Sequence, residues 1–236
     1  KLAVAVVVVT TLSTGAIAQN AKVVISSASK PMGADGLNSI TYSGSAANGN
    51  FGQSKTIAGP LAVTTISNYT RAIDLTQPAS RATGATTPAP LARTFHQNIT
   101  PANAAWTQQL EIWVTPWGFL KGAAENAATV RAQKIRGKAY NVVSWSPSTK
   151  APSGQAYRLN GYIDEQNMVE RVETWVEHPV LGDLLVDTTY SDYKDFGGLK
   201  VPSKIVQKRA ELTTFEATIT AATANPPNIK EPLTPP

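Results

Sequence analysis

Serine and lysine stand three positions apart at Ser27 and Lys30, the spacing of a catalytic pair in which lysine helps to deprotonate serine. Serine enzymes of this kind also carry Ser-Asp-Asn and Lys-Thr-Gly motifs. Here Ser191-Asp192 is followed by Tyr193, and Lys55-Thr56 by Ile57, so both motifs are incomplete. A serine hydrolase using Ser27 and Lys30 is therefore kept only as an alternative, and the polar face of a helix is the simpler interpretation.

Metal chemistry has few ligands to draw on. The 236 residues include two histidines and no cysteine, which excludes thiolate zinc sites, iron–sulfur clusters and cysteine nucleophiles. His96 and His178, with Asp183 and Asp187, could in principle hold one zinc ion. Lone histidines are more often surface or turn residues. We therefore expect no metal site and no cofactor in this chain.

Acidic residues gather in the second half of the sequence. Paired carboxylates act as acid and nucleophile in retaining glycosidases when they lie about 5 Å apart, a distance that sequence spacing does not reveal. Charges on the solvent face of strands are the simpler interpretation, so we expect no catalytic residue. The acidic residues are Glu165, Glu170, Glu173, Glu177, Asp183 and Asp187.

Large apolar residues form a helical stripe in the middle of the chain. Their spacing predicts an amphipathic helix, which Thr115-Pro116 interrupts by serving as N-cap and first residue of a second helix. The stripe is either ordinary packing of helices on a sheet or one wall of an apolar pocket for an acyl chain. The candidate pocket residues are Trp106, Leu110, Trp113, Trp117, Phe119 and Leu120.

The elements around this stripe are mostly strands. A first helix is expected at 20–29, with Asn20 as its N-cap, and irregular chain or short edge strands at 76–103. Short connections make neighbouring strands antiparallel, in a meander, sheet or incomplete barrel with helices on one side. The predicted strands are 40–43, 63–74, 138–146, 155–163, 167–177, 184–193, 201–209 and 213–223.

The two ends of the chain have compositions of their own. Residues 1–18 combine Lys1, an apolar run and an Ala-x-Ala ending, which predicts a secretory signal peptide too short to span a bilayer. Proline-rich residues 226–236 read as a linker to a further domain, which leaves one domain at 19–225. We expect a periplasmic or secreted protein without a transmembrane segment in its mature chain.

The net charge of +5 is unevenly spread, since the first half of the chain is basic and the second acidic. A basic half raises the question of nucleic-acid binding, but its positive residues are dispersed except at Arg131, Lys134, Arg136 and Lys138. The simpler interpretation is that the two halves meet in one sheet and largely neutralise each other. We expect no nucleic-acid partner.

Several runs together resemble a known family. They are 113–122 (WVTPWGFLKG), Gly182-Asp183, 190–198 (YSDYKDFGG) and 201–207 (VPSKIVQ). Residues 20–225 resemble the N-terminal region of secreted bacterial proteins whose C-terminal half is a metallo-β-lactamase-fold hydrolase. That region is similar to the LolA-like periplasmic lipoprotein carriers. The resemblance implies an α+β fold: a strongly curved antiparallel sheet, or unclosed β-barrel, with a few helices on its concave side.

The resemblance also frames the functional hypotheses. The hydrolase half carries a His-x-His-x-Asp-His zinc motif that is absent here, so zinc is expected only in a covalently linked C-terminal domain. We expect this chain to be a non-catalytic extracytoplasmic accessory or binding domain, with a hydrophobic small molecule or acyl chain as ligand. The alternatives are a stand-alone periplasmic lipid- or lipoprotein-binding protein and the serine hydrolase described above.

Overall fold

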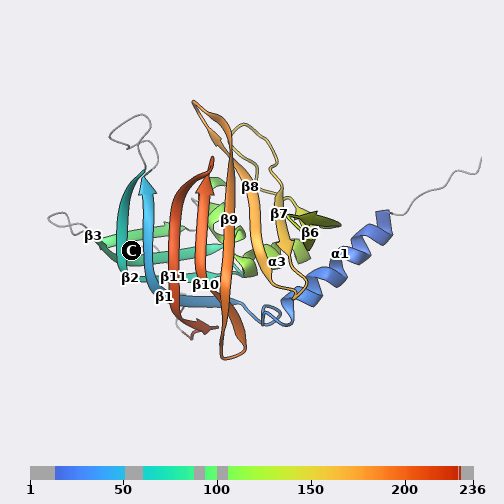
Figure 1. Cartoon of the computed structure of the whole chain (residues 1–236), viewed down its shortest axis with the longest axis horizontal. Coiled ribbons are helices and arrows are strands. Elements are labelled where there is room, and N and C mark those ends of the chain that lie inside the picture. The colour runs from blue at the N-terminus through green and yellow to red at the C-terminus, as the bar shows by residue number, and fades with distance from the viewer. Residues whose placement is uncertain (1–13, 51–60, 88–93, 100–105, 228, 230–236) are drawn as a thin grey trace, which may run out of the picture.

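The described part of the chain folds into one antiparallel sheet of eleven strands that is not closed (Figure 1). The computed structural model describes residues 14–50, 61–87, 94–99, 106–227 and 229. The spatial order is β4-β3-β2-β1-β11-β10-β9-β8-β7-β6-β5, so β4 and β5 form the two edges. The strands are β1 Ser39–Asn50, β2 Ala62–Asp74, β3 Ala79–Thr87, β4 Thr94–Ile99, β5 Thr129–Ile135, β6 Lys138–Trp145, β7 Leu159–Ile163, β8 Val169–His178, β9 Gly182–Phe196, β10 Leu199–Arg209 and β11 Leu212–Ala224.

Three helices are described, and they pack against the concave side of this sheet. Helix α1 covers Thr14–Ser29, α2 covers Trp106–Trp113 and α3 covers Pro116–Glu125. Helix α1 packs against α3, β5 and β6, and α3 also packs on β6 and β8. We call α2 and α3 together the helical cover. The predicted α+β class, with a curved, unclosed antiparallel sheet and helices on its concave side, is confirmed.

Close packing between strands and helices depends on residues without side chains. Gly161 on β7 faces Phe119 of α3, and an added Cβ would lie 2.1 Å from the phenyl ring. Gly122 of α3 faces Trp145 of β6 in the same way, with the indole also 2.1 Å from an added Cβ. These two glycines let α3 lie directly on β6 and β7, which places the apolar side of the helical cover deep in the core.

The predicted elements agree best with the structure in the second half of the chain. All six strands predicted after residue 138 are present, with ends shifted by a few residues. Helix α1 begins at Thr14 and not at residue 20. The prediction of Asn20 as its N-cap is therefore wrong, because Asn20 lies inside the helix. Strand β5 was missed, since only Val130 and Ile135 in TVRAQKI are large apolar residues and this edge strand is mostly exposed.

The signal peptide predicted at 1–18 and the linker predicted at 226–236 stay predictions, because the structure describes only part of each segment. Residues 1–13 lie outside the described residues, and 14–18 form the start of α1. In the predicted linker only residues 226, 227 and 229 are described. No helix in the described ranges has the length and hydropathy needed to cross a membrane.

Candidate functional site

The helical cover turns sharply between α2 and α3, as the Thr115-Pro116 pair predicted. Thr115 is the N-cap of α3: its Oγ1 accepts a hydrogen bond from the backbone N of Gly118 at 3.1 Å. The same hydroxyl donates to the backbone oxygen of Ile112 at 2.7 Å, which ties the end of α2 to the start of α3. Pro116 stands at the first helical position, where its missing N–H is not needed.

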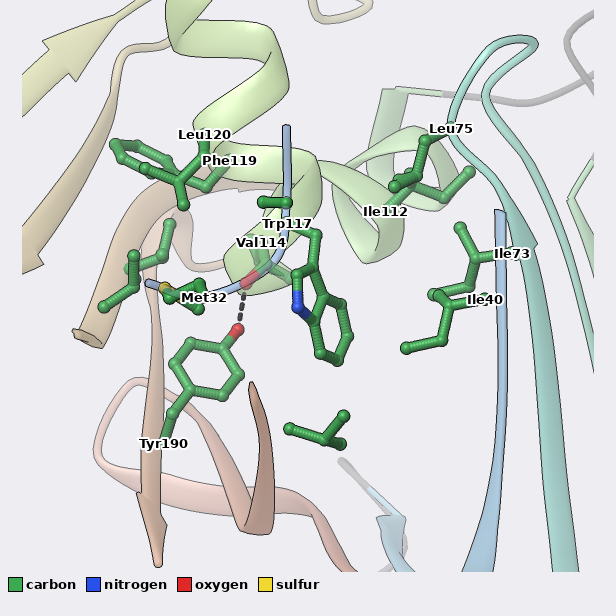
Figure 2. Packing of buried hydrophobic residues seen from close by; sticks show 14 of the residues in the cluster. Met32, Ile40, Ile73, Leu75, Ile112, Val114, Trp117, Phe119, Leu120 and Tyr190 are labelled. Carbon is green, nitrogen blue, oxygen red and sulfur yellow. Dashed lines mark hydrogen bonds between the residues drawn. The ribbon is translucent and has the colours of Figure 1, made fainter. Parts of the chain in front are cut away.

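The six residues of the predicted apolar pocket separate into two groups. Trp117, Phe119 and Leu120 lie in the main core between the cover and the sheet (Figure 2). Trp113 is partly buried and packs against the same core. Trp106 and Leu110, near the start of α2, belong to a second cluster. That cluster also contains Ala151, Tyr157, Val176, Leu184 and Val186, with Trp175 packed against it.

The space beneath the cover is filled in this structure. Trp117 and Phe119 are 1% and 0% exposed, and Tyr42 packs against the indole of Trp117 at a ring distance of 6.2 Å. Between the described residues of the cover and the sheet there is a cavity of about 20 Å³, enough for about one water molecule. It lies where α2 and α3 meet the sheet, between Trp117, Ile205 and Phe215. An acyl chain would therefore enter only if the cover moved away from the sheet.

Few polar contacts tie the cover to the strands beneath it. The hydroxyl of Tyr190 on β9 donates to the backbone oxygen of Val114 (Figure 2). The indole Nε1 of Trp117 donates to the backbone oxygen of Lys200 at 3.3 Å. Close to the same turn, Arg71 donates from Nη2 to the backbone oxygen of Glu111 on α2 at 3.0 Å. These contacts connect the cover to β2, β9 and β10.

Arg71 is the unusual member of this set because it is a charged group in the core. It is 4% exposed, and its Nε donates to Oγ of Ser80 on β3 at 2.9 Å. Burial opposes its charge, yet the neighbouring Tyr42, Tyr69 and Glu111 raise the pKa of the guanidinium above its ordinary value. Arg71 therefore stays charged at every physiological pH.

Hydroxyl and amide groups surround the same cavity. Burial raises the pKa of Tyr42 and raises that of Tyr190 well above its ordinary value, so both phenols stay neutral and can donate hydrogen bonds. Gln207 and Thr188 are buried neighbours on β10 and β9, with Nε2 of Gln207 3.4 Å from Oγ1 of Thr188. The cavity thus brings polar groups of the sheet, such as Arg71 and Gln207, next to apolar surface from both the cover and the sheet, such as Trp117 and Phe215.

Sequence reasoning missed these polar residues, although one signal was present. Tyr69, Arg71 and Ile73 alternate along β2, so Arg71 is in phase with two residues that are 1% and 0% exposed. A positive charge in the dry phase of a strand indicates either a buried partner or a functional site. Tyr190 and Gln207 gave no such signal, since a tyrosine or glutamine in a strand is common on both faces.

Two solved structures resemble this chain over most of its length. A domain assigned to outer-membrane lipoprotein sorting, from Vibrio parahaemolyticus, aligns with 92% of this chain and 100% of its own, at a TM-score of 0.52 and 10% identity. A LolA superfamily protein from Nitrosomonas europaea aligns with 91% of this chain and 97% of its own, at a TM-score of 0.51 and 10% identity. The fold is LolA-like. No protein-family model and no curated protein sequence matches the chain.

The other residues for which catalysis or metal binding was considered do not line the cavity beneath the cover, as far as the structure describes them. Ser27 and Lys30 are both exposed on and just after α1, and no hydrogen bond joins them within the described part of the chain. A nucleophile and its base must be within hydrogen-bond reach, so this geometry gives the serine-hydrolase alternative no support.

The histidines and carboxylates serve local structure where they are described. His178 accepts hydrogen bonds at Nδ1 from the backbone N of Val180 and Leu181, at 3.3 and 3.2 Å, as expected of a turn residue. The side chain of His96, on β4, lies outside the described residues. Among the residues that are described, no group of three His, Asp or Glu side chains is placed to hold a metal ion.

The acidic residues of β8 and β9 take part in ion pairs. Arg171 binds Asp187 through two hydrogen bonds of 2.7 and 2.9 Å and pairs with Glu173 at 2.5 Å. Lys138 pairs with Glu170. Asp187 is paired across neighbouring strands, Glu173 along the same strand and Glu170 by a lysine from β6, which favours the interpretation as charges on the solvent face.

Proposed function

We propose that this LolA-like chain is a non-catalytic binding domain that holds the apolar part of a lipid or lipoprotein between the helical cover and the concave sheet. One observation carries the proposal: the cover presents Trp117, Phe119 and Leu120 to the sheet, yet among the described residues only a few hydrogen bonds and one ion pair tie it there. An acyl chain offers the same apolar contact that the cover makes with the sheet.

The energy needed to open the cover is within reach of lipid binding. A typical intramolecular hydrogen bond contributes about 1 kcal/mol net, so releasing three of them costs about 3 kcal/mol. Each methylene of an acyl chain that leaves water returns about 0.8 kcal/mol. A chain of ordinary length therefore more than offsets the loss of these hydrogen bonds, provided that its own contact with α2 and α3 replaces the apolar contact that these helices lose with the sheet.

The two similar structures support the same role. One is assigned to outer-membrane lipoprotein sorting and the other to the LolA superfamily, and both align with this chain from end to end at low identity. We propose by analogy that this protein acts in the periplasm or after secretion, where lipids and lipoproteins need a soluble carrier or anchor. The predicted signal segment at 1–18 fits this location.

Quenching of tryptophan fluorescence by a brominated fatty acid tests the proposal. Bromine quenches an indole that it contacts, so saturable quenching is expected in the wild-type chain. The Trp117→Phe variant should lose most of the quenching, because Trp117 lies against the cavity. The matched Trp175→Phe variant should keep it, because Trp175 packs in the second cluster. Absence of saturable quenching would reject the proposal.

The link to a hydrolase is a separate and finer proposal. It rests on the resemblance described above, in which a metallo-β-lactamase-fold domain with the zinc follows the LolA-like domain. The coding sequence after Pro236 tests it directly, since a downstream His-x-His-x-Asp-His motif would support the fusion. A stop codon at that point would favour the stand-alone lipid- or lipoprotein-binding protein.

A further inference from the structure

Arg71 is a buried cation without a carboxylate partner. Within the described residues, no carboxylate forms an ion pair with it, although it is only 4% exposed. The carboxylate of Glu111, which acts on Arg71 electrostatically, is paired through Oε1 with Nη2 of Arg209 at 3.2 Å, and Arg71 donates to the backbone oxygen of Glu111. Together these three side chains carry a net positive charge beneath the cover. Burying a charge in this way is unfavourable unless an anion joins it.

The groups around Arg71 include several hydrogen-bond donors that suit an anion, and the one carboxylate among the residues described there, that of Glu111, is paired with Arg209. Tyr42 and Tyr190 are buried neutral phenols that line the cavity with Arg71, and Gln207 adds an amide. The apolar surface of Trp117 and the other cover residues begins directly beside this polar group. A ligand that fills both parts has a negatively charged head next to an apolar tail.

We infer that the ligand is an acidic amphiphile whose carboxylate or phosphate head binds Arg71 beneath the helical cover. The inference rests on the proposed lipid-binding function and narrows its ligand class. A guanidinium binds either head group through charge-assisted hydrogen bonds, which are stronger than its present bond to a neutral backbone oxygen.

The same contact explains how the head group would act on the cover. Arg71 holds α2 through the bond from Nη2 to the backbone oxygen of Glu111. An acidic head competes for that donor, so binding of the head releases the first of the contacts that hold the cover closed. The tail then occupies the apolar surface that the moving cover exposes. A neutral amphiphile must open the cover without this exchange.

Binding of three dodecyl compounds to the full chain tests the inference. Dodecanoate, dodecyl phosphate and dodecanol share one tail and differ in the head, and their affinities are measured by calorimetry below micelle-forming concentrations. Both acids should bind about tenfold or more tightly than dodecanol, the gain expected of a charge-assisted hydrogen bond. Acetate and inorganic phosphate, as heads without tails, should bind far more weakly than the dodecyl acids.

Substitutions at Arg71 test whether this residue causes the tighter binding of the two dodecyl acids. Arg71→Gln should abolish the preference for acids while leaving dodecanol binding in place, and Arg71→Lys should restore part of it. Arg158→Gln removes an exposed arginine and should change nothing. If Arg71→Gln fails to fold, the comparison of heads on the unchanged chain still decides the question.

The outcomes separate this inference from the function on which it rests. Equal affinity for dodecanol and the two acids would overturn the inference and leave lipid binding intact. No binding of any dodecyl compound would overturn both. Acetate or inorganic phosphate binding as tightly as the dodecyl acids would show a free-anion site and would also overturn the acidic amphiphile.

Discussion

Tyr190 shows how a single hydroxyl group connects the sheet to the helical cover. Its ring is 4% exposed in the core, and its hydroxyl donates to the backbone oxygen of Val114, between α2 and α3. That oxygen belongs to the turn where one helix ends and the next begins, so it has no place in a regular helical ladder. The hydroxyl of Tyr190 therefore supplies a partner that the turn itself lacks.

Replacing Tyr190 with phenylalanine should reveal what this contact contributes. The Tyr190→Phe variant leaves the oxygen of Val114 buried without that donor and should lower the free energy of unfolding by about 1 to 3 kcal/mol. Urea unfolding followed by circular dichroism measures the change. Tyr140→Phe is the matched control, because its half-buried hydroxyl bonds to Glu170 at 2.8 Å near solvent. Equal losses in the two variants would contradict this account of the cover.

Individual strands and helices could be predicted where their side chains alternate or repeat. Strand β11 was found because Phe215, Ala217 and Ile219 alternate with polar residues, and the two helices of the cover because Thr115-Pro116 marks a helix start. Strand β5 lacks alternation because one edge is unpaired and its faces are largely exposed. Local patterns report burial, so an element that buries little gives little signal.

The candidate site was predictable only in part, because local sequence patterns do not show which distant segments pack together. The helical repeat placed Trp113, Trp117, Phe119 and Leu120 on one apolar side, and these residues do face the core. It could not show that Trp106 and Leu110 belong to another cluster, because their partners there, such as Tyr157 and Leu184, come from distant parts of the chain. Arg71 reaches the site from a distant strand, and such a contact has no local sequence pattern.

The contact between α3 and the strands beneath it makes a prediction about Gly161. In Gly161→Ala the new methyl group would overlap the ring of Phe119, so the variant should lose about 1 to 3 kcal/mol of unfolding free energy. Gly36→Ala is the control, because an added Cβ there meets no atom within 4 Å. Thermal and urea unfolding of the two variants measure the difference. A Gly161→Ala variant as stable as Gly36→Ala would mean that α3 does not rest on β7.

The whole molecule buries several phenols along its sheet. Burial raises the pKa of Tyr42, Tyr190 and Tyr193 above their ordinary value of 10.0. On β7, burial and a hydrogen bond to Glu173 raise the pKa of Tyr162 to about 12. Because these pKa values are raised in the folded state, the neutral phenols favour folding at every pH below the unfolded value near 10.

This distribution predicts cooperative unfolding in alkali. Stability should be constant with respect to these groups below pH 10.0 and should fall as the pH rises from there toward the folded-state pKa values. Tyrosinate absorbance and circular dichroism, recorded on the same samples, should change together in one step. Gradual tyrosine ionisation centred near pH 10 with unchanged circular dichroism would show that the phenols are not buried.

Covalent mapping of a bound acyl chain tests most directly whether ligand lies between the helical cover and the concave sheet. The full chain is irradiated with a fatty acid that carries a diazirine in its tail, and the modified residues are identified by mass spectrometry. The adducts should fall on the inner side of α2 and α3 and on inward residues of β9 and β10 such as Tyr190 and Ile205, and excess dodecanoate should suppress them. Adducts confined to outward residues such as Tyr140 and Arg171, or adducts that dodecanoate does not suppress, would contradict the account.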